Sequence, residues 1–531
     1  MQSPFSSLEF DNVYVDELPA DTEGKNYRRQ VRGACFSRVT PTPVDDPELV
    51  AHSPEMARRL GFDDDVDRDP AFVDVMAGNG LTDQMEPYAT CYGGHQFGSW
   101  AGQLGDGRAI NLGEVEGTDG TRWVLQLKGA GTTPYSRRGD GRAVLRSSIR
   151  EFLCSEAMHH LGISTSRALS LVTTGETVVR DMFYDGNPAP EPGAVVCRAS
   201  PSFLRFGNFQ LFAARNDIET LRTVADFAIR HYFPHVGEPG PRAYRRFLEE
   251  VCCRTADLIV DWMRVGFVHG VMNTDNMSIL GRTIDYGPYG WLEEYDPGWT
   301  PNTSDSTTRR YRFGQQPQIA MWNLGQFGFA LTPLIGSEEP VEETLTIYQD
   351  RFEEKWRSMM AEKLGLATYD ESTDDALTDD LFELLEEVDT DMTIFFRNLA
   401  DVDAETSAEL DDGELVASLE DAYYDPEAFD RMTGRIADWV RRWAARVERH
   451  GMPAEQRRAR MNRVNPKYVL RNYLTQMAID ESEEGDHSMV RELLDVMRNP
   501  YDEQPEYEEY ASRRPAWADD KPGCTRLSCS S

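Results

Sequence analysis

Two periodicities of apolar residues divide this chain. Short apolar runs at Ala109 to Leu112 and Trp123 to Lys128 are separated by the turn-forming sequence Gly-Thr-Asp-Gly. Apolar runs of this length, bounded by glycine, are typical of paired β-strands. Two more strands are predicted at Thr177 to Asp181 and Gly193 to Ser200. The first half of the chain is therefore expected to contain a small β-sheet.

Segments with the apolar spacing of a helix lie between these strand-like runs and make up most of the second half of the chain. Apolar residues recur every three or four positions from Arg142 to Leu161 and from Arg242 to Arg264, and each segment is followed by a glycine that favours a helix end. A short helix is predicted at Pro54 to Gly61, and Met277 to Tyr286 reads as a hairpin that turns at Gly281. Beyond about Thr332 the pattern is helical and acidic.

Strands that precede helices in one continuous unit, with no internal repeat, predict an α+β protein. We expect a bilobal fold with a small β-rich N-terminal lobe, a larger helical C-terminal lobe, and an extension at each end. The predicted divisions are 1–87 for an N-terminal extension that wraps the core, 88–345 for the core, and 346–531 for a helical C-terminal extension with a cysteine-containing tail.

Charge excludes two classes of partner. Ninety-one acidic and 55 basic residues give a formal net charge of -36, which repels nucleic acid and anionic membrane surfaces. The acid is spread along the chain and only six basic residues are Lys, which suits either a high-salt habitat or a GC-rich genome. Without a signal-like N-terminus or a spanning apolar segment, the sequence is expected to be cytoplasmic.

A glycine-rich segment and one lysine point to phosphate chemistry. Gly102 to Arg108 contains glycines that would let backbone N–H groups approach a polyphosphate, although such glycines are often only a turn. Lys128 follows at the end of a strand, where protein kinases place the lysine that grips phosphates. Glu151, on the next helix, is a candidate partner that would position the Lys128 ammonium; the alternatives are an edge-strand lysine and an exposed helix acid.

Arginines are concentrated in the next part of this acidic chain. Asp140 is the only acidic residue in the stretch that contains the first five of them. Arginine forks bind phosphate oxygens in pairs, and an ion-pair network with nearby carboxylates is the rival explanation. Either reading makes this region the most cationic part of the sequence. The residues concerned are Arg137, Arg138, Arg142, Arg146, Arg150, Arg198 and Arg205.

The segment His269 to Asn276, followed by Asp285-Tyr286-Gly287, aligns with the kinase patterns H-R-D-x-x-x-x-N and D-F-G. Asn276 and Asp285 then fall on the metal-binding positions, a hard-oxygen pair suited to Mg²⁺ or Mn²⁺. Val271 occupies the place of the kinase catalytic aspartate and cannot accept a proton. Asp275, beside Asn276, is the candidate base.

With these motifs in place, the sequence resembles the selenoprotein O family of protein adenylyltransferases, also called pseudokinases. The resemblance spans nearly the whole chain. It is carried by Leu8 to Asn12, Tyr92 to Gly98, Gln103 to Arg108, Gln126 to Gly131, His269 to Asn276, Asp285 to Pro288, Gln316-Pro317, Trp322 to Leu324, Asn465 to Tyr468 and the terminal Leu527 to Ser531.

The resemblance implies a kinase-like fold in which ATP lies reversed, so that AMP passes to a Ser, Thr or Tyr hydroxyl of a protein and pyrophosphate leaves; UTP is a second nucleotide to test. It implies Asp275 as the proton acceptor and Asn276 and Asp285 as ligands of Mg²⁺ or Mn²⁺. The implied nucleotide contacts are Gly105, Gly107, Arg108, Lys128, Asp140, Gly141, Arg198, Arg205 and Asp285.

Many members of that family carry a cysteine after the D-Y-G-P motif that can pair with a C-terminal cysteine. This sequence has Gly298 to Asp305 there, without cysteine, so it lacks one partner of that family pairing. Cys524 and Cys529 remain a possible redox pair within the tail, and a free thiol is the alternative. No other pair of the eight cysteines suggests a metal knuckle or a disulfide scaffold.

Two other functions remain open from the sequence. One is transfer of the γ-phosphate with Asp275 as a replacement base, and the other is a catalytically silent scaffold that binds ATP to dock partners. The expected partners are ATP and proteins that present hydroxyl groups, with no nucleic acid and no membrane, and the chain is expected to be a monomer.

Overall fold

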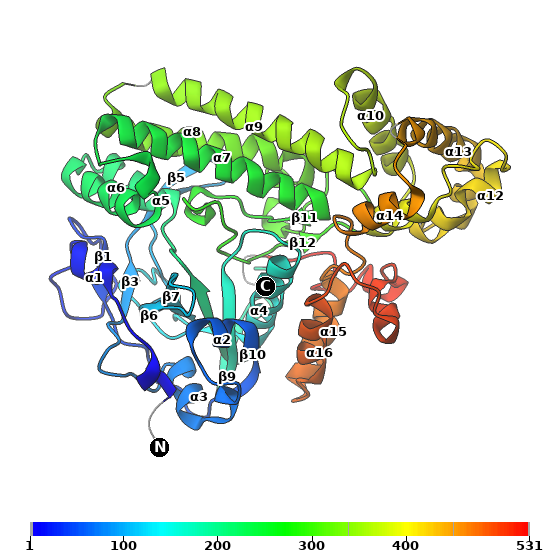
Figure 1. The fold of residues 1–531 in the computed structure, drawn as a ribbon. Coiled ribbons are helices and arrows are strands. Elements are labelled where there is room, and N and C mark those ends of the chain that lie inside the picture. The colour runs from blue at the N-terminus through cyan, green and yellow to red at the C-terminus, as the bar shows by residue number, and fades with distance from the viewer. Residues whose placement is uncertain (1–3, 338, 450, 529–531) are drawn as a thin grey trace.

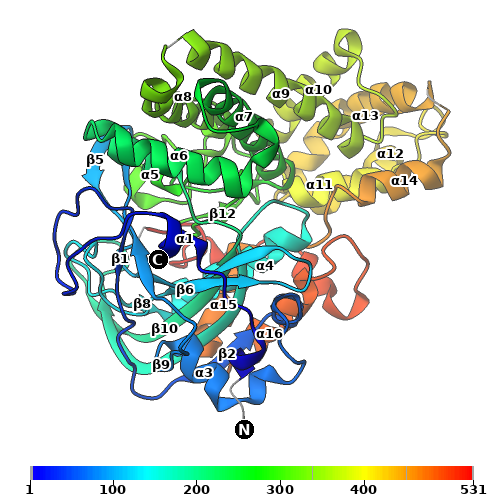
Figure 2. The same ribbon diagram turned by 60° about the vertical axis from the view of Figure 1, so that its left-hand side comes forward.

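The computed structural model describes residues 4–337, 339–449 and 451–528. A sheet lobe lies below a layer of long helices, and a second helical group projects to one side (Figure 1). Turning the view shows the sheet lobe and the helix layer still stacked one above the other (Figure 2). This arrangement confirms the predicted α+β, kinase-like architecture with its β-rich N-terminal part and helical C-terminal part.

Eight strands form the main sheet, in the order β1-β3-β6-β7-β10-β9-β2, with β8 paired to β10. Both edge strands come from the first 87 residues. The strands are β1 (Phe36–Arg38), β2 (Glu48–His52), β3 (Tyr88–Thr90), β6 (Ala109–Glu116), β7 (Arg122–Lys128), β8 (Ala143–Val144), β9 (Arg167–Arg180) and β10 (Ala189–Ser200). Two small antiparallel pairs stand apart: β4 (Gly93–Gln96) with β5 (Ser99–Gln103), and β11 (Phe267–Val268) with β12 (Gly290–Trp291).

The two faces of the sheet are buried in different cores, as the two-residue period of a strand requires. Ala194 and Val196 of β10 lie in the large core with helix α4 (Leu145–His160). Val195 and Cys197 lie in a second core with the N-terminal segment. That second core also receives the short helices α2 (Pro54–Leu60) and α3 (Pro70–Ala77), while α1 (Val13–Glu17) packs into the first.

Helices build the rest of the molecule. Next to the sheet lobe lie α5 (Phe206–Ala214), α6 (Ile218–Tyr232), α7 (Pro241–Val265), α8 (Gln316–Ile335) and α9 (Glu339–Lys363). The projecting group comprises α10 (Glu371–Glu387), α11 (Met392–Asn398), α12 (Asp412–Val416), α13 (Pro426–Glu448) and α14 (Ala454–Asn462). The last two helices, α15 (Asn472–Glu483) and α16 (Ser488–Met497), return to the sheet lobe and pack on α4.

The structure differs from the sequence predictions at several element ends. The α4 segment was expected from Arg142, but Ala143 and Val144 pair with Ala194 and Gly193 and form β8. Strand β9 begins ten residues before the predicted strand, because its first six residues are all buried and so lack an alternating pattern. In the predicted hairpin, Met277 pairs with Thr283 through a single bridge.

The domain boundaries remain predictions, and two observations bear on them. Strands β1 and β2 are hydrogen-bonded into the sheet, so the first 87 residues form part of it. The predicted boundary at residues 345 and 346 lies within α9.

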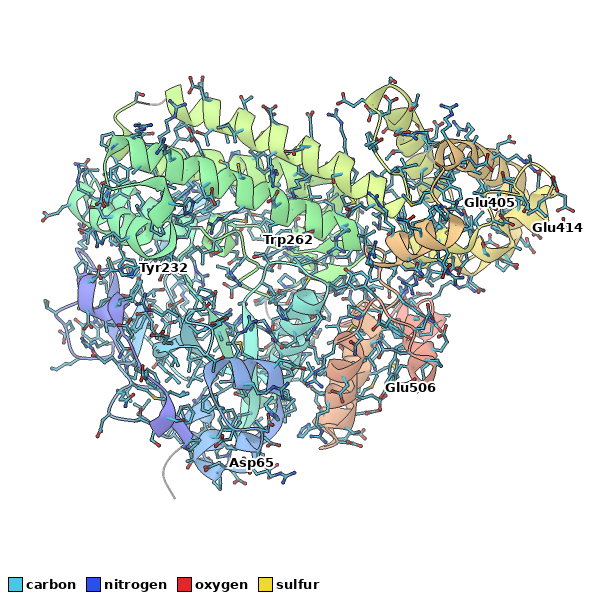
Figure 3. All side chains as sticks on the ribbon, in the orientation of Figure 1. Asp65, Tyr232, Trp262, Glu405, Glu414 and Glu506 are labelled. Atoms are coloured by element: carbon cyan, nitrogen blue, oxygen red, sulfur yellow. The ribbon has the colours of Figure 1, made fainter. Side chains whose placement is uncertain are left out.

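Some of the many acidic residues lie at the outer edge of the molecule. Glu405, Glu414 and Glu506 project from the periphery, whereas Trp262 lies within the helical layer (Figure 3). Within the described ranges, none of the helices combines the length and apolar character needed to cross a bilayer.

Candidate active site

Lys128 lies where three elements meet. It ends β7, Glu151 comes from α4, and Asp285 follows the segment that closes against residues 164–166. The Lys128 Nζ is 2.5 Å from Glu151 Oε2 and 3.2 Å from Asp285 Oδ1. The predicted partnership of Lys128 and Glu151 is therefore present in the geometry, and Asp285 joins it.

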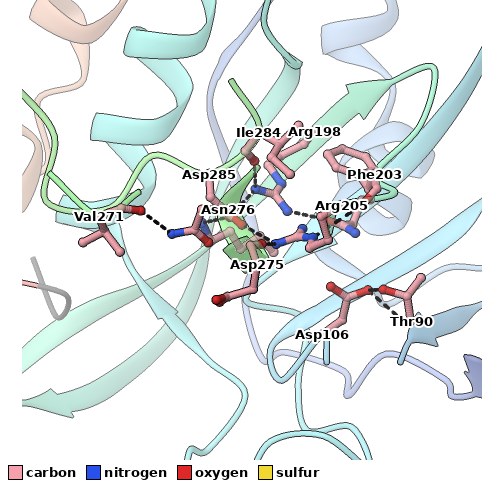
Figure 4. Close-up of polar contacts among 12 residues, drawn as sticks. Thr90, Asp106, Arg198, Phe203, Arg205, Val271, Asp275, Asn276, Ile284 and Asp285 are labelled. Carbon is pink, nitrogen blue, oxygen red and sulfur yellow. Dashed lines mark hydrogen bonds and ion pairs between the residues drawn. The ribbon is translucent and has the colours of Figure 1, made fainter. Parts of the chain in front are cut away.

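Two buried arginines complete this cluster (Figure 4). Arg198 Nη1 lies 2.7 Å from Glu151 Oε1 and 2.9 Å from Asp285 Oδ1, and Arg205 Nη1 lies 2.7 Å from Asp285 Oδ2. The register of the sheet explains the position of Arg198, because its cross-strand partner on β7 is Gln126, whose side chain accepts a hydrogen bond from Arg198 Nη2. Three cations thus surround one carboxylate.

These charges set the ionisation of the site. Burial alone would raise the pKa of Asp285, but Lys128, Arg205 and Arg198 outweigh it and hold that pKa well below its ordinary value. Burial lowers the pKa of Lys128, and the charges of Glu151 and Asp285 oppose that effect. Asp285 is therefore an anion throughout the physiological pH range.

Asp275 lies in a different electrostatic environment from Asp285. It belongs to a short 3₁₀ turn, Thr274–Asn276, and its Oδ2 accepts a hydrogen bond of 3.1 Å from Gln96 Nε2. Its Oδ1 is buried and has no hydrogen-bond partner among the described residues. Burial raises the pKa of Asp275 to about 6, while the Gln96 hydrogen bond and Arg205 act in the opposite direction. A carboxylate with one uncommitted oxygen and a pKa near neutrality is suited to accepting a proton.

Asn276 is oriented by the residue that replaces the kinase base. Its Nδ2 donates a 2.8 Å hydrogen bond to the backbone carbonyl of Val271, which leaves the amide oxygen available (Figure 4). That oxygen and the ionised Asp285 are hard ligands of the kind that Mg²⁺ and Mn²⁺ prefer. The residues present therefore fit a divalent metal, which Asn276 and Asp285 would hold.

The glycine-rich segment, Gly102 to Arg108, packs against the loop that contains Tyr135 and Arg137. At Gly105, with φ +81°, an added Cβ would lie 2.4 Å from the Tyr135 ring, and at Gly107 it would lie 3.1 Å from the Tyr135 carbonyl. The Arg108 carbonyl accepts a hydrogen bond from the Gly129 N–H, which places Arg108 beside Lys128. At this position the charge of Arg108 lowers the pKa of Lys128. These glycines are required by loop packing, whatever they bind.

Asp140 and Gly141 lie apart from this cluster. Asp140 forms a bidentate pair with Arg180, with both N–O distances 2.7 Å, and its side chain is half exposed. Within the described ranges it makes no polar contact with Lys128, Arg198 or Asp285. Gly141 supports the loop, since a Cβ there would lie 2.1 Å from the carbonyl carbon of Gly131. Their predicted nucleotide contacts remain predictions.

The structure describes one of the two cysteines of the predicted redox pair. Cys529 lies outside the described residues. Cys524 is a buried free thiol, and burial raises its pKa to about 12, which disfavours the reactive thiolate. The redox role remains a prediction.

Sequence reasoning assigned no role to several residues that shape the site. Gln96 holds Asp275, Gln126 holds Arg198, and the Arg205 guanidinium lies 4.6 Å from the centre of the Tyr92 ring. Asp106 is buried and accepts hydrogen bonds from the Thr90 N–H and hydroxyl. One signal was available: Gln126 and Lys128 are two residues apart on one strand and so share a face.

Comparisons with known proteins agree with this geometry. The family described as Protein adenylyltransferase SelO matches residues 25–498. A protein nucleotidyltransferase YdiU of Rhodopirellula baltica is 58% identical over 536 residues, covering 99% of this chain and 99% of its own. The YdiU proteins of Azoarcus sp. and Aromatoleum aromaticum are 58% and 57% identical, covering 99% of this chain and 99% and 100% of their own. The chain belongs to the SelO family of protein adenylyltransferases.

Proposed function

We propose that this protein transfers AMP from ATP to Ser, Thr or Tyr hydroxyls of acceptor proteins and releases pyrophosphate. One observation carries the proposal: Asp275 offers a buried, unpartnered carboxylate oxygen beside a cluster of three cations, while Val271 stands where a kinase keeps its base. A base and a set of phosphate-binding cations are thus both present, but not in the arrangement of a kinase.

Asp275 takes the acceptor proton in this proposal. The acceptor hydroxyl gives its proton to the Asp275 carboxylate, the hydroxyl oxygen forms a bond to the α-phosphorus, and the bond from that phosphorus to the oxygen that bridges it to the β-phosphorus breaks. The electron pair of the broken bond leaves with pyrophosphate. The hydrogen bond from Gln96 to Asp275 Oδ2 fixes the orientation of the carboxylate.

Lys128, Arg198 and Arg205 bind phosphate oxygens in this proposal. Their positions are held by Glu151, Gln126 and Tyr92, so little reorganisation is needed when charge develops. Asn276 and Asp285 would hold Mg²⁺ or Mn²⁺, and the metal would neutralise phosphate charge. Gly105, Gly107, Arg108, Asp140 and Gly141 are proposed as further nucleotide contacts from the sequence resemblance.

Intact mass spectrometry provides the test. The protein is incubated with an acceptor protein, MnCl₂ or MgCl₂, and ATP or UTP. We expect the acceptor to gain one AMP and pyrophosphate to accumulate in equal amount, and the Asp275→Asn variant to lose this gain while still binding nucleotide. Gain of one phosphate would favour the kinase reading, and tight binding with neither product would favour the scaffold reading.

A further inference from the structure

An aromatic surface lies beside the candidate base. The β4–β5 hairpin (residues 93–103) carries Phe97 and Trp100, whose side chains are 41% and 40% exposed. The ring of His95 lies 5.1 Å from that of Trp100 and 5.5 Å from that of Trp322, which comes from α8. Both ribbon views place β5 beside α5, at one end of the helix layer (Figures 1 and 2). Large exposed aromatic side chains grouped in this way are typical of a binding surface.

The hairpin is fixed to the turn that carries Asp275. The His95 N–H donates to Thr274 Oγ1 at 2.7 Å, and the Phe97 N–H donates to Asn273 Oδ1 at 3.1 Å. Between them, Gln96 bonds to Asp275 itself. A polypeptide that rests on Phe97 and Trp100 is therefore held against a hairpin that contacts the proposed base directly.

Arg310 faces this hairpin from the loop before α8, and two further arginines belong to the same loop. Arg309, Arg310 and Arg312 make no ion pair with any carboxylate among the described residues, although the chain carries a net charge of -36. Arg310 lies over the hairpin tip: a Cβ on Gly98 would be 3.4 Å from its guanidinium carbon, which is 4.8 Å from the Trp322 ring. The hairpin itself contains no charged residue.

Asp305, the acidic residue of this loop, bonds to backbone N–H groups and forms no ion pair with the described arginine side chains. Asp305 is buried, and its carboxylate accepts hydrogen bonds from the backbone N–H groups of Arg310 and Tyr311 and from the Thr308 hydroxyl. Tyr311 in turn donates its hydroxyl to Asn273 and packs on Phe97, with ring centres 5.3 Å apart. Loop and hairpin thus form one continuous aromatic and cationic surface, which we call the aromatic–arginine surface: residues 95–100, 309–312 and Trp322.

We propose that the aromatic–arginine surface binds an acidic segment of the acceptor protein and presents its hydroxyl to Asp275. The partner follows from charge complementarity: three guanidinium groups without carboxylate partners favour Asp and Glu, and the flanking aromatic rings favour an apolar residue between them. This inference rests on the proposed function, which supplies the reaction. It adds the chemistry of the acceptor.

Two fluorescent peptides test the inference. Each carries one serine and one leucine, flanked by glutamates in one peptide and by lysines in the other. We expect fluorescence anisotropy without nucleotide to show tighter binding of the acidic peptide. Arg310→Glu and Trp100→Ala should each weaken that binding about fivefold or more, as loss of an interface anchor does. With ATP and MnCl₂, Arg310→Glu should raise the KM for the acidic peptide and leave kcat unchanged.

Arg449→Glu is the matched control, because Arg449 is an exposed arginine at the end of α13, far from the hairpin, and its change alters the net charge equally. It should behave as wild type. Equal binding of the two peptides, or unchanged acidic-peptide affinity in Arg310→Glu, would overturn the inference. Competition by a single-stranded oligonucleotide would assign the surface to nucleic acid and would also overturn it. Binding without AMP transfer would instead contradict the proposed function and leave the docking result standing.

Discussion

Asp275 is held in a state that costs stability. A carboxyl group whose folded pKa is about 6 and whose unfolded pKa is about 3.9 binds its proton more tightly in the folded protein. The stabilisation this gives is complete below pH about 3.9 and is lost as the pH rises through 6. At pH 7 the ionised Asp275 therefore lowers the free energy of unfolding.

Replacing Asp275 by Asn should stabilise the protein at neutral pH. An amide cannot ionise and can still accept the hydrogen bond from Gln96, so we expect a free energy of unfolding about 1 to 3 kcal/mol higher than wild type at pH 7. At pH 4 the difference should vanish. Denaturant unfolding at both pH values measures it, and a variant less stable than wild type at pH 7 would contradict the assignment.

The same carboxyl group should control the rate. A base must be deprotonated, so kcat/KM should rise about tenfold per pH unit up to about pH 6 and then level off. The measurement is AMP transfer at substrate concentrations below KM between pH 4.5 and 8. Asp285 adds no step in this range, because Lys128, Arg205 and Arg198 keep it ionised. A rate independent of pH from 5 to 7 would exclude Asp275 as the base.

Among the elements, the β4–β5 hairpin depends on a close contact with α5. A Cβ on Gly207, near the start of that helix, would lie 2.1 Å from the Gly93 carbonyl oxygen, and one on Gly94 would lie 2.6 Å from Asp275 Oδ1. No side chain fits at either position unless the hairpin moves. The hairpin therefore holds its place against Asp275 only while both glycines are kept.

Gly207→Ala should lower kcat/KM at least about tenfold, because a shifted hairpin no longer aligns Gln96 with Asp275. Gly434→Ala is the matched control. Gly434 also lies in a helix, α13, but its Cβ would meet only Asp412 Oδ2 at 3.7 Å, so we expect full activity and about 0.5 to 1 kcal/mol of added stability. Enzyme assays and thermal unfolding of both variants separate the two effects. Equal activity in Gly207→Ala would show that the hairpin position does not matter.

The sequence predicted the elements that carry Lys128 and Glu151, because strand and helix periodicity is a local property. The hairpin predicted around Asp285 is present only as a single bridge between Met277 and Thr283. It did not predict the hairpin formed by β4 and β5, since Gly93 to Gln103 lacks an alternating apolar pattern and is held by contacts to residues near 274. It also gave no role to Gln126. The pairing of β7 with β10 places Gln126 opposite Arg198, where its side chain accepts a hydrogen bond from that arginine. Long-range pairing decides these roles.

At the scale of the whole molecule, the charge of -36 repels itself, and salt should relieve that repulsion. Raising NaCl from about 0.1 M to about 1 M shortens the screening length from about 10 Å to about 3 Å. We expect the unfolding temperature to rise, by about 1 °C for each kcal/mol of repulsion removed, because the unfolding entropy scales with chain length. Differential scanning fluorimetry measures it, with sucrose of equal osmolality as the control. A falling unfolding temperature would argue against a fold adapted to salt.

The order of elements along the chain predicts the two lobes. It does not predict the contacts by which the two ends of the chain pack onto the sheet lobe. A strand-rich first part and a helical second part predicted two lobes, and the structure has them. The first 87 residues supply both edges of the sheet, and α15 and α16 return from the far end to cover α4. Such contacts join residues that are far apart along the chain, and a single sequence carries no local signal for them.

The central claim is that this site gives up AMP and not phosphate. The most direct measurement incubates the protein and an acceptor with ATP labelled at either the α- or the γ-phosphorus and follows the label into protein. The account predicts protein-bound label from α-labelled ATP, none from γ-labelled ATP, and loss of transfer in Asp275→Asn. Label that enters protein only from the γ-position would contradict it.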